Sequence, residues 1–160
     1  MRAPLVPPPL WMLMFAAAEW LVSRYAPLLP LLPLLDAPSR RFGWWVMALA
    51  LVPAAPAFVQ FRRAHTTVNP HRPEKAAALV TDGVYAWTRN PMYLSLALLL
   101  IGWAIRLGAL SALIVALLFM PLIARVQIRA EEQALRGRFG DEYERYCRRV
   151  HRWFGRRAGD

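Results

Sequence analysis

The chain has 160 residues, which is room for one domain, and we predict a single domain over residues 1–160. Its hydrophobic share of 58% exceeds that of an ordinary soluble domain, so much of its surface must face lipid. The formal net charge is +10, and ten of the twenty basic residues lie at or after Arg125, beside apolar runs. This placement follows the positive-inside pattern of membrane proteins and argues against a nucleic-acid-binding protein.

Residues that bind metals or form disulfides are scarce. Cys147 is the one cysteine, which excludes a disulfide within the chain and a cysteine-rich metal site. His65, His71 and His151 lack the spacing of a zinc site, so we predict no metal. A phosphate or lipid headgroup contact for His65 and His71 stays open. Arginine outnumbers lysine nineteen to one, which suggests a GC-rich bacterial gene and hence the bacterial inner membrane.

Residues 1–61 are predicted to hold the N-terminal membrane helices. The first helix covers about residues 10–25 and follows three consecutive prolines, which suit the first turn of a helix. Glu19 interrupts its apolar run, so we interpret the segment as a retained anchor and not as a cleaved signal peptide. Prolines at 27, 30 and 33 then exclude a regular helix.

A polar turn is expected over residues 36–41, before the clearest membrane span. Residues 42–61 contain no charged side chain and predict a spanning helix. Pro53 and Pro56 lie inside this span and should kink it, because each removes a backbone donor.

The second region covers residues 62–154. After a long polar loop, residues 91–105 and 107–124 form two apolar segments joined by a short tip, which predicts an antiparallel helical hairpin. The second of these helices should continue in polar sequence until Gly140 ends or bends it.

An amphipathic helix is expected after Gly140, lying on the cytoplasmic membrane face or closing over a site. Its apolar side chains recur at helical spacing: Tyr143, Tyr146, Val150, Trp153 and Phe154. The fold class predicted is therefore an all-α integral membrane bundle of about four transmembrane helices with a C-terminal amphipathic helix. Basic residues after Phe61 and after Arg125 place both termini in the cytoplasm, although Arg24, Arg40 and Arg41 oppose this orientation.

The central motif, LVTDGVYAWTRNPMY, lies at residues 79–93 between apolar spans. It combines a turn pair with charged, amide and aromatic side chains, more than a connecting loop requires. Pro91 fits the first turn of the following helix, so Arg89 and Asn90 lie at its positive N-terminal end, where polar ligands gather.

This motif is followed about forty residues later by Glu131 and Glu132, and then by FGDEYERY at residues 139–146. The two motifs resemble those of the isoprenylcysteine carboxyl methyltransferase family and its phospholipid N-methyltransferase relatives. The resemblance covers roughly residues 65–153, whereas the first sixty residues are similar only in being hydrophobic.

The resemblance implies an S-adenosylmethionine-dependent methyltransferase without a Rossmann fold. It implies that residues 62–154 are the catalytic core and that the cofactor pocket lies on the cytoplasmic side. It implies that Leu79 and Val80 form the adenine slot and that Glu131 is an acidic cofactor contact. The other cofactor contacts that it implies are Gly83, Tyr85, Asn90, Pro91 and Tyr93. Arg89, Asn90 and Glu131 are the implied catalytic residues, with Arg89 paired either to the cofactor carboxylate or to an acidic side chain.

The chain departs from the isoprenylcysteine enzymes at two positions. Asn90 replaces a histidine, and Gln127 occupies the place of the arginine expected to hold a substrate carboxylate. Arg125 and Arg129 flank Gln127 but project from other faces of a helix, and we take these three as the candidate acceptor contacts. The acceptor could be a phospholipid amine, an isoprenoid acid or a lipophilic thiol.

Two other functions remain alternatives at this point. Membrane sterol reductases share a related C-terminal architecture and bind NADPH, although they are usually longer. A non-enzymatic membrane protein could also keep the fold. The expected partners are membrane lipids and a lipophilic substrate, not nucleic acid, and the oligomeric state is left open.

Overall fold

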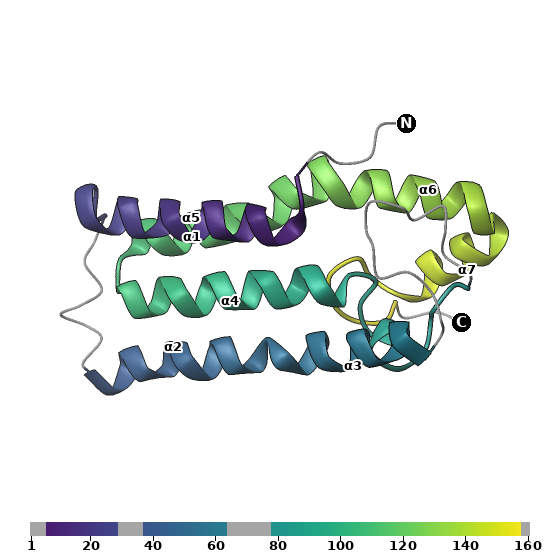
Figure 1. The fold of residues 1–160 in the computed structure, drawn as a ribbon, viewed down its shortest axis with the longest axis horizontal. Coiled ribbons are helices and arrows are strands. Elements are labelled where there is room, and N and C mark those ends of the chain that lie inside the picture. Colours follow the sequence, from purple (N-terminus) through teal and green to yellow (C-terminus); the bar gives the residue numbers. More distant parts are fainter. Residues whose placement is uncertain (1–5, 29–36, 64–77, 158–160) are drawn as a thin grey trace. The chain divides into compact units, whose positions relative to one another are not determined.

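The computed structural model describes residues 6–28, 37–63 and 78–157 (Figure 1). Most of these residues lie in helices, and the described part contains no β-strand beyond a single bridge between Val150 and Arg156. The all-α prediction is therefore confirmed. The segment with prolines 30 and 33 lies outside the described residues, as do His65 and His71.

The helices fall into two compact units. The first, called here the apolar unit, comprises Val6–Val52 and Ser95–Ala124. The second, called the motif unit, comprises Pro53–Leu94 and Arg125–Asp160. Each unit is described by itself below.

In the apolar unit, α1 (Pro8–Tyr25) runs along α5 (Leu110–Ile123), as Figure 1 shows. Phe15 and Phe119 meet edge to face between them, with ring centroids 5.4 Å apart. α1 begins at the predicted prolines, which lack N–H groups that the first turn could not use. Glu19 is 0% exposed, and within the described residues its carboxylate oxygens have no hydrogen-bond partner.

The predicted polar turn is wrong for residues 37–41, which belong to α2 (Ala37–Leu49). A proline is tolerated in the first turn of a helix, so Pro38 does not prevent this earlier start. A hydrogen bond to α4 (Pro91–Leu107) also stabilises the start of α2: Arg40 Nε donates to the Arg106 carbonyl at 3.2 Å. The Arg106 guanidinium lies 4.0 Å from the centre of the Trp44 ring.

The predicted span is divided by a one-residue break: α2 ends at Leu49 and α3 (Leu51–Arg63) begins after Ala50, three residues before Pro53. Pro53 cannot donate to the carbonyl four residues earlier, so the helix is interrupted at this point. The Ala50 N–H instead bonds three residues back, to Met47 O at 3.1 Å.

Two helices in the described part of the chain are long and apolar enough to cross a membrane. These are Arg40–Gln60 and Leu110–Phe139, whereas Pro91–Leu107 is apolar but shorter. The predicted number of four spans is not confirmed. Many large apolar side chains are exposed, among them Leu13, Trp45 and Leu117, as expected for surfaces that face lipid.

In the motif unit, a π-helical segment η3 (Ala124–Ile128) leads into α6 (Arg129–Phe139). Gly140 has φ +50° and turns the chain into α7 (Asp141–Arg149), as predicted. The amphipathic helix ends earlier than expected. Trp153 and Phe154 lie in a turn, because Val150 leaves the helix to form an antiparallel bridge with Arg156.

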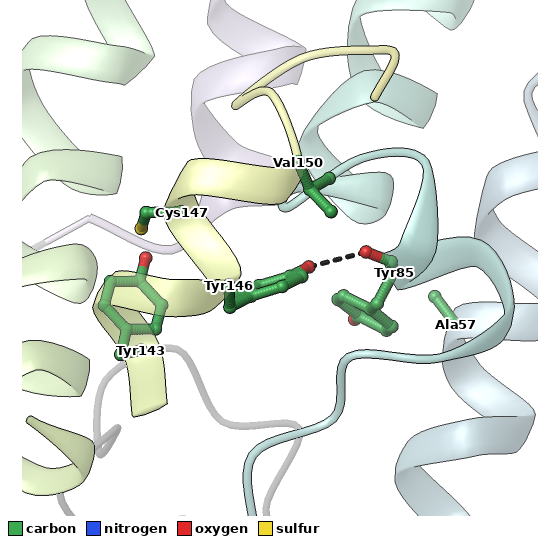
Figure 2. Close-up of a cluster of buried hydrophobic side chains, with 6 residues drawn as sticks. All are labelled: Ala57, Tyr85, Tyr143, Tyr146, Cys147 and Val150. Carbon is green, nitrogen blue, oxygen red and sulfur yellow. Dashed lines mark hydrogen bonds between the residues drawn. The ribbon is translucent and has the colours of Figure 1, made fainter. Parts of the chain in front are cut away.

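The core of the motif unit is a cluster of buried side chains shown in Figure 2: Ala57, Tyr85, Tyr143, Tyr146, Cys147 and Val150. The Tyr146 hydroxyl donates to the Tyr85 carbonyl at 2.7 Å. This bond joins α7 to the short 3-10 helix η2 (Gly83–Ala86) of the central motif.

Candidate functional site

The motif begins with a tight turn at Gly83, which has φ +54°. Gln60 on α3 donates from Nε2 to the Asp82 carbonyl at 3.2 Å. A Cβ atom at Gly83 would lie 1.8 Å from Gln60 Nε2. The backbone conformation therefore favours glycine here, and a larger residue would also displace the Gln60 amide.

Asn90 and Pro91 start α4 as the sequence predicts. The Asn90 carbonyl accepts the first helical hydrogen bond, from Leu94 N–H at 2.9 Å. The Asn90 N–H donates to Thr88 Oγ1 at 3.1 Å, and its side-chain Nδ2 donates to the Arg152 carbonyl at 3.1 Å. The amide is 9% exposed, and these bonds fix its orientation.

The two motifs meet at Tyr93 and Glu131. The Tyr93 hydroxyl donates to Glu131 Oε1 at 2.5 Å, although the residues are 38 positions apart. Tyr93 is 5% exposed and Glu131 is partly buried. A carboxylate has a second oxygen that can accept hydrogen bonds from a ligand.

The neighbouring acid, Glu132, has a different environment. Arg152 donates to it through two nitrogens, from Nε to Oε1 at 2.9 Å and from Nη2 to Oε2 at 2.6 Å. Arg89 Nη1 lies 3.3 Å from Glu132 Oε1 and also donates to Cys147 Sγ. In the structure, Arg89 thus pairs with the acidic side chain of Glu132.

Leu79 and Val80 pack, partly buried, against the cluster around Tyr85. Gln127 on η3 is 0% exposed, whereas Arg125 and Arg129 are exposed.

Burial also determines the protonation of the aromatic residues in the motif unit. It raises the pKa values of the Tyr85 and Tyr146 phenols, so both stay neutral and can donate hydrogen bonds. Hydrogen bonding to Glu132 raises the pKa of the Arg152 guanidinium, which stays charged.

Sequence reasoning missed Gln60 and Arg152. Gln60 lies at the end of an apolar helix, where a single amide gives no signal of its own. Arg152 lies in a segment predicted to be helical, and only the turn after α7 directs it toward Glu132.

Comparison with known proteins identifies relatives. A model of the phospholipid methyltransferase family matches residues 39–142, more than half of the chain. An uncharacterized protein of Haemophilus influenzae is 45% identical over 62 residues, which cover 39% of this chain and 98% of that protein. Protein-S-isoprenylcysteine O-methyltransferase of Schizosaccharomyces pombe is 33% identical over 95 residues, which cover 59% of this chain but only 40% of that enzyme.

These matches confirm the family predicted from the motifs. The matched residues include the whole of the central motif together with Glu131 and Glu132. With the two helices that are apolar and long enough to cross a membrane, they indicate a membrane methyltransferase. The chain belongs to the phospholipid methyltransferase family.

Proposed function

We propose that this protein transfers a methyl group from S-adenosylmethionine to a lipophilic acceptor at the membrane. The observation that carries the proposal is the meeting of the two motifs, in which Tyr93 holds Glu131 beside the start of α4. The Glu131 carboxylate offers a negative charge and a second acceptor oxygen, which suit a polar, cationic ligand better than a purely apolar one.

The residues present fit the cofactor's chemistry. When bound, S-adenosylmethionine supplies a methyl group on a positively charged sulfur. Glu131 can accept hydrogen bonds from ribose hydroxyls or from the α-ammonium group, and Leu79 and Val80 offer apolar contacts for adenine. The fixed amide of Asn90 supports the positioning of polar groups at the same place.

Gln127 bears on the choice of acceptor. It is buried and neutral, so a carboxylate brought against it would lack the paired cation that a buried charge needs. We therefore propose a neutral or amine-bearing lipid, or a thiol, ahead of a prenylated cysteine acid.

Ligand binding tests the proposed cofactor. Protein purified in detergent micelles should be stabilised against heat by S-adenosylhomocysteine and not by NADPH. Glu131→Gln should reduce this stabilisation while leaving the melting temperature without ligand unchanged. Stabilisation by NADPH alone would favour a reductase instead, and stabilisation by neither ligand would favour a protein without this activity.

A competition assay tests the acceptor. Phosphatidylethanolamine, a lipophilic thiol and a farnesylcysteine analogue can be offered together with labelled S-adenosylmethionine. We expect the label in the amine or the thiol. Efficient carboxyl methylation of the farnesylcysteine analogue, retained in Gln127→Ala, would contradict the argument from Gln127 and point to Arg125 or Arg129 as the cation.

We also propose that the protein lies in the bacterial inner membrane with its motif unit at the cytoplasmic face. Six arginines and no acidic residue occur between Arg145 and Arg157. Trp87 and Phe154 are exposed and stack with ring centroids 6.4 Å apart. Exposed aromatic rings beside arginines suit an anionic lipid interface.

A further inference from the structure

The last described residues form a compact turn that we call the clasp, residues 150–157. His151 N–H donates to Gly155 O at 2.9 Å, and Arg157 N–H donates to Arg149 O at 2.9 Å. Gly155 has φ +102°, which favours glycine at the centre of the turn. The match to the family ends at residue 142, so the clasp lies outside it.

The backbone of the clasp bonds to the central motif. Arg89 N–H donates to His151 O at 3.2 Å, and Gly155 N–H donates to Trp87 O at 2.7 Å. The residues just before α4 lie outside any regular helix or sheet, so their backbone N–H and C=O groups need hydrogen-bond partners elsewhere. The clasp therefore holds the segment that presents Arg89 and Asn90.

Arg152 is the member of the clasp that reaches both motifs. Its carbonyl accepts hydrogen bonds from Asn90 Nδ2 at 3.1 Å and from Thr88 Oγ1 at 3.4 Å. Its guanidinium forms the two-pronged pair with Glu132, whose side chain is 4% exposed. One residue thus links the amide at the start of α4 to the acid that follows Glu131.

We propose that Arg152 is a positioning residue of the cofactor site, which sets Asn90 through its main chain and the Glu131–Glu132 pair through its side chain. This inference rests on the proposed function, since it assumes that both motifs contact S-adenosylmethionine. The planar guanidinium matters, because a lysine ammonium cannot hold both carboxylate oxygens in the same geometry.

Arg152→Lys tests this role with the charge retained. The dissociation constant of S-adenosylhomocysteine is measured by calorimetry in micelles, well below the melting temperature of each variant, with folding checked by circular dichroism. We expect binding weaker by about tenfold. Arg148→Lys, at an exposed arginine of α7, is the matched control and should bind as the wild type does.

A double-mutant cycle tests whether Arg152 acts through Glu132. If it does, Glu132→Gln and Arg152→Gln together should weaken binding hardly more than either change alone. Additive losses would overturn the coupling, and wild-type affinity in a folded Arg152→Lys protein would overturn the positioning role. A wild-type protein that binds no S-adenosylhomocysteine would instead contradict the proposed function, so the two failures are distinguishable.

Discussion

Glu131 and Glu132 are adjacent on α6, but we expect them to have different roles because their partners differ. Glu131 accepts a hydrogen bond from the neutral Tyr93 hydroxyl, whereas Glu132 forms ion pairs with Arg89 and Arg152. Glu131→Gln keeps an oxygen for the Tyr93 hydroxyl and removes only the charge. We expect ligand-free stability to be retained and S-adenosylhomocysteine binding to weaken by about 1.5–3 kcal/mol, measured by calorimetry. Equal affinity in wild type and Glu131→Gln would exclude a cofactor contact.

Glu132→Gln should instead lower the stability of the protein without ligand. It leaves Arg89, whose side chain is 7% exposed, without its counter-ion. We expect the free energy of unfolding to fall by about 2 kcal/mol, less than for a fully buried pair because the side chain of Arg152 is 32% exposed. The melting temperature without ligand measures this, and a value equal to that of Glu131→Gln would contradict it.

The hydroxyl of Tyr146 should matter for stability. In Tyr146→Phe the buried Tyr85 carbonyl loses its donor, which we expect to cost about 1–2 kcal/mol in thermal unfolding. Tyr25→Phe is the control, because Tyr25 is 75% exposed on α1. Similar melting temperatures for the two variants would mean that the hydroxyl does not hold η2 to α7.

Single residues were predictable where a motif or a spacing marks them. The start of α4 at Pro91 and the place of Tyr143 and Tyr146 on the helix after Gly140 are confirmed. The choice of Arg152 was not predictable, since the sequence offers several nearby arginines and only the turn after Arg149 selects one.

At the scale of elements, α2 and α4 approach each other at two glycines. A Cβ at Gly43 would lie 2.6 Å from Gly102 O, and a Cβ at Gly102 would lie 2.7 Å from Gly43 O. Because these neighbours are backbone atoms, Gly43→Ala or Gly102→Ala must push the helices apart. We expect a loss of about 1–3 kcal/mol in thermal unfolding.

Gly137 provides the control for this pair. It lies inside α6, and a Cβ there would meet nothing within 4 Å. Gly137→Ala should raise stability by up to about 1 kcal/mol, because alanine loses less backbone entropy in a helix. Destabilisation of all three alanine variants to the same degree would argue against a specific contact between α2 and α4.

Helix boundaries were predictable where proline or glycine sets them, as at residue 91 and at Gly140. The predicted boundaries were wrong where tertiary contacts set the end of a helix. α2 begins at Ala37 because Arg40 bonds to α4, and α7 ends at Arg149 because Val150 pairs with Arg156. The π-helical turn at residues 124–128 has no marker in the sequence beyond nearby Pro121.

For the whole molecule, the prediction concerns topology. The apolar helices were predicted as four spans, and two of them are confirmed as long and apolar enough. With the four predicted spans, residues near the two ends of the chain should lie on the same side of the membrane as the central motif. The six arginines between Arg145 and Arg157 place that side in the cytoplasm, whereas the hairpin tip at Gly108 has Arg106 alone beside it.

Reporter fusions check this arrangement. A reporter that is active only in the cytoplasm should work when fused after Asp160 and fail when inserted at Gly108, and a periplasmic reporter should show the reverse. Moving basic residues to the tip by changing Ala109 and Ser111 to arginine should weaken this preference, since orientation follows the positive charge near the span ends. A fusion after Asp160 that is active only in the periplasm would contradict the orientation and place the motif unit, with Glu131 and Arg152, away from cytoplasmic S-adenosylmethionine.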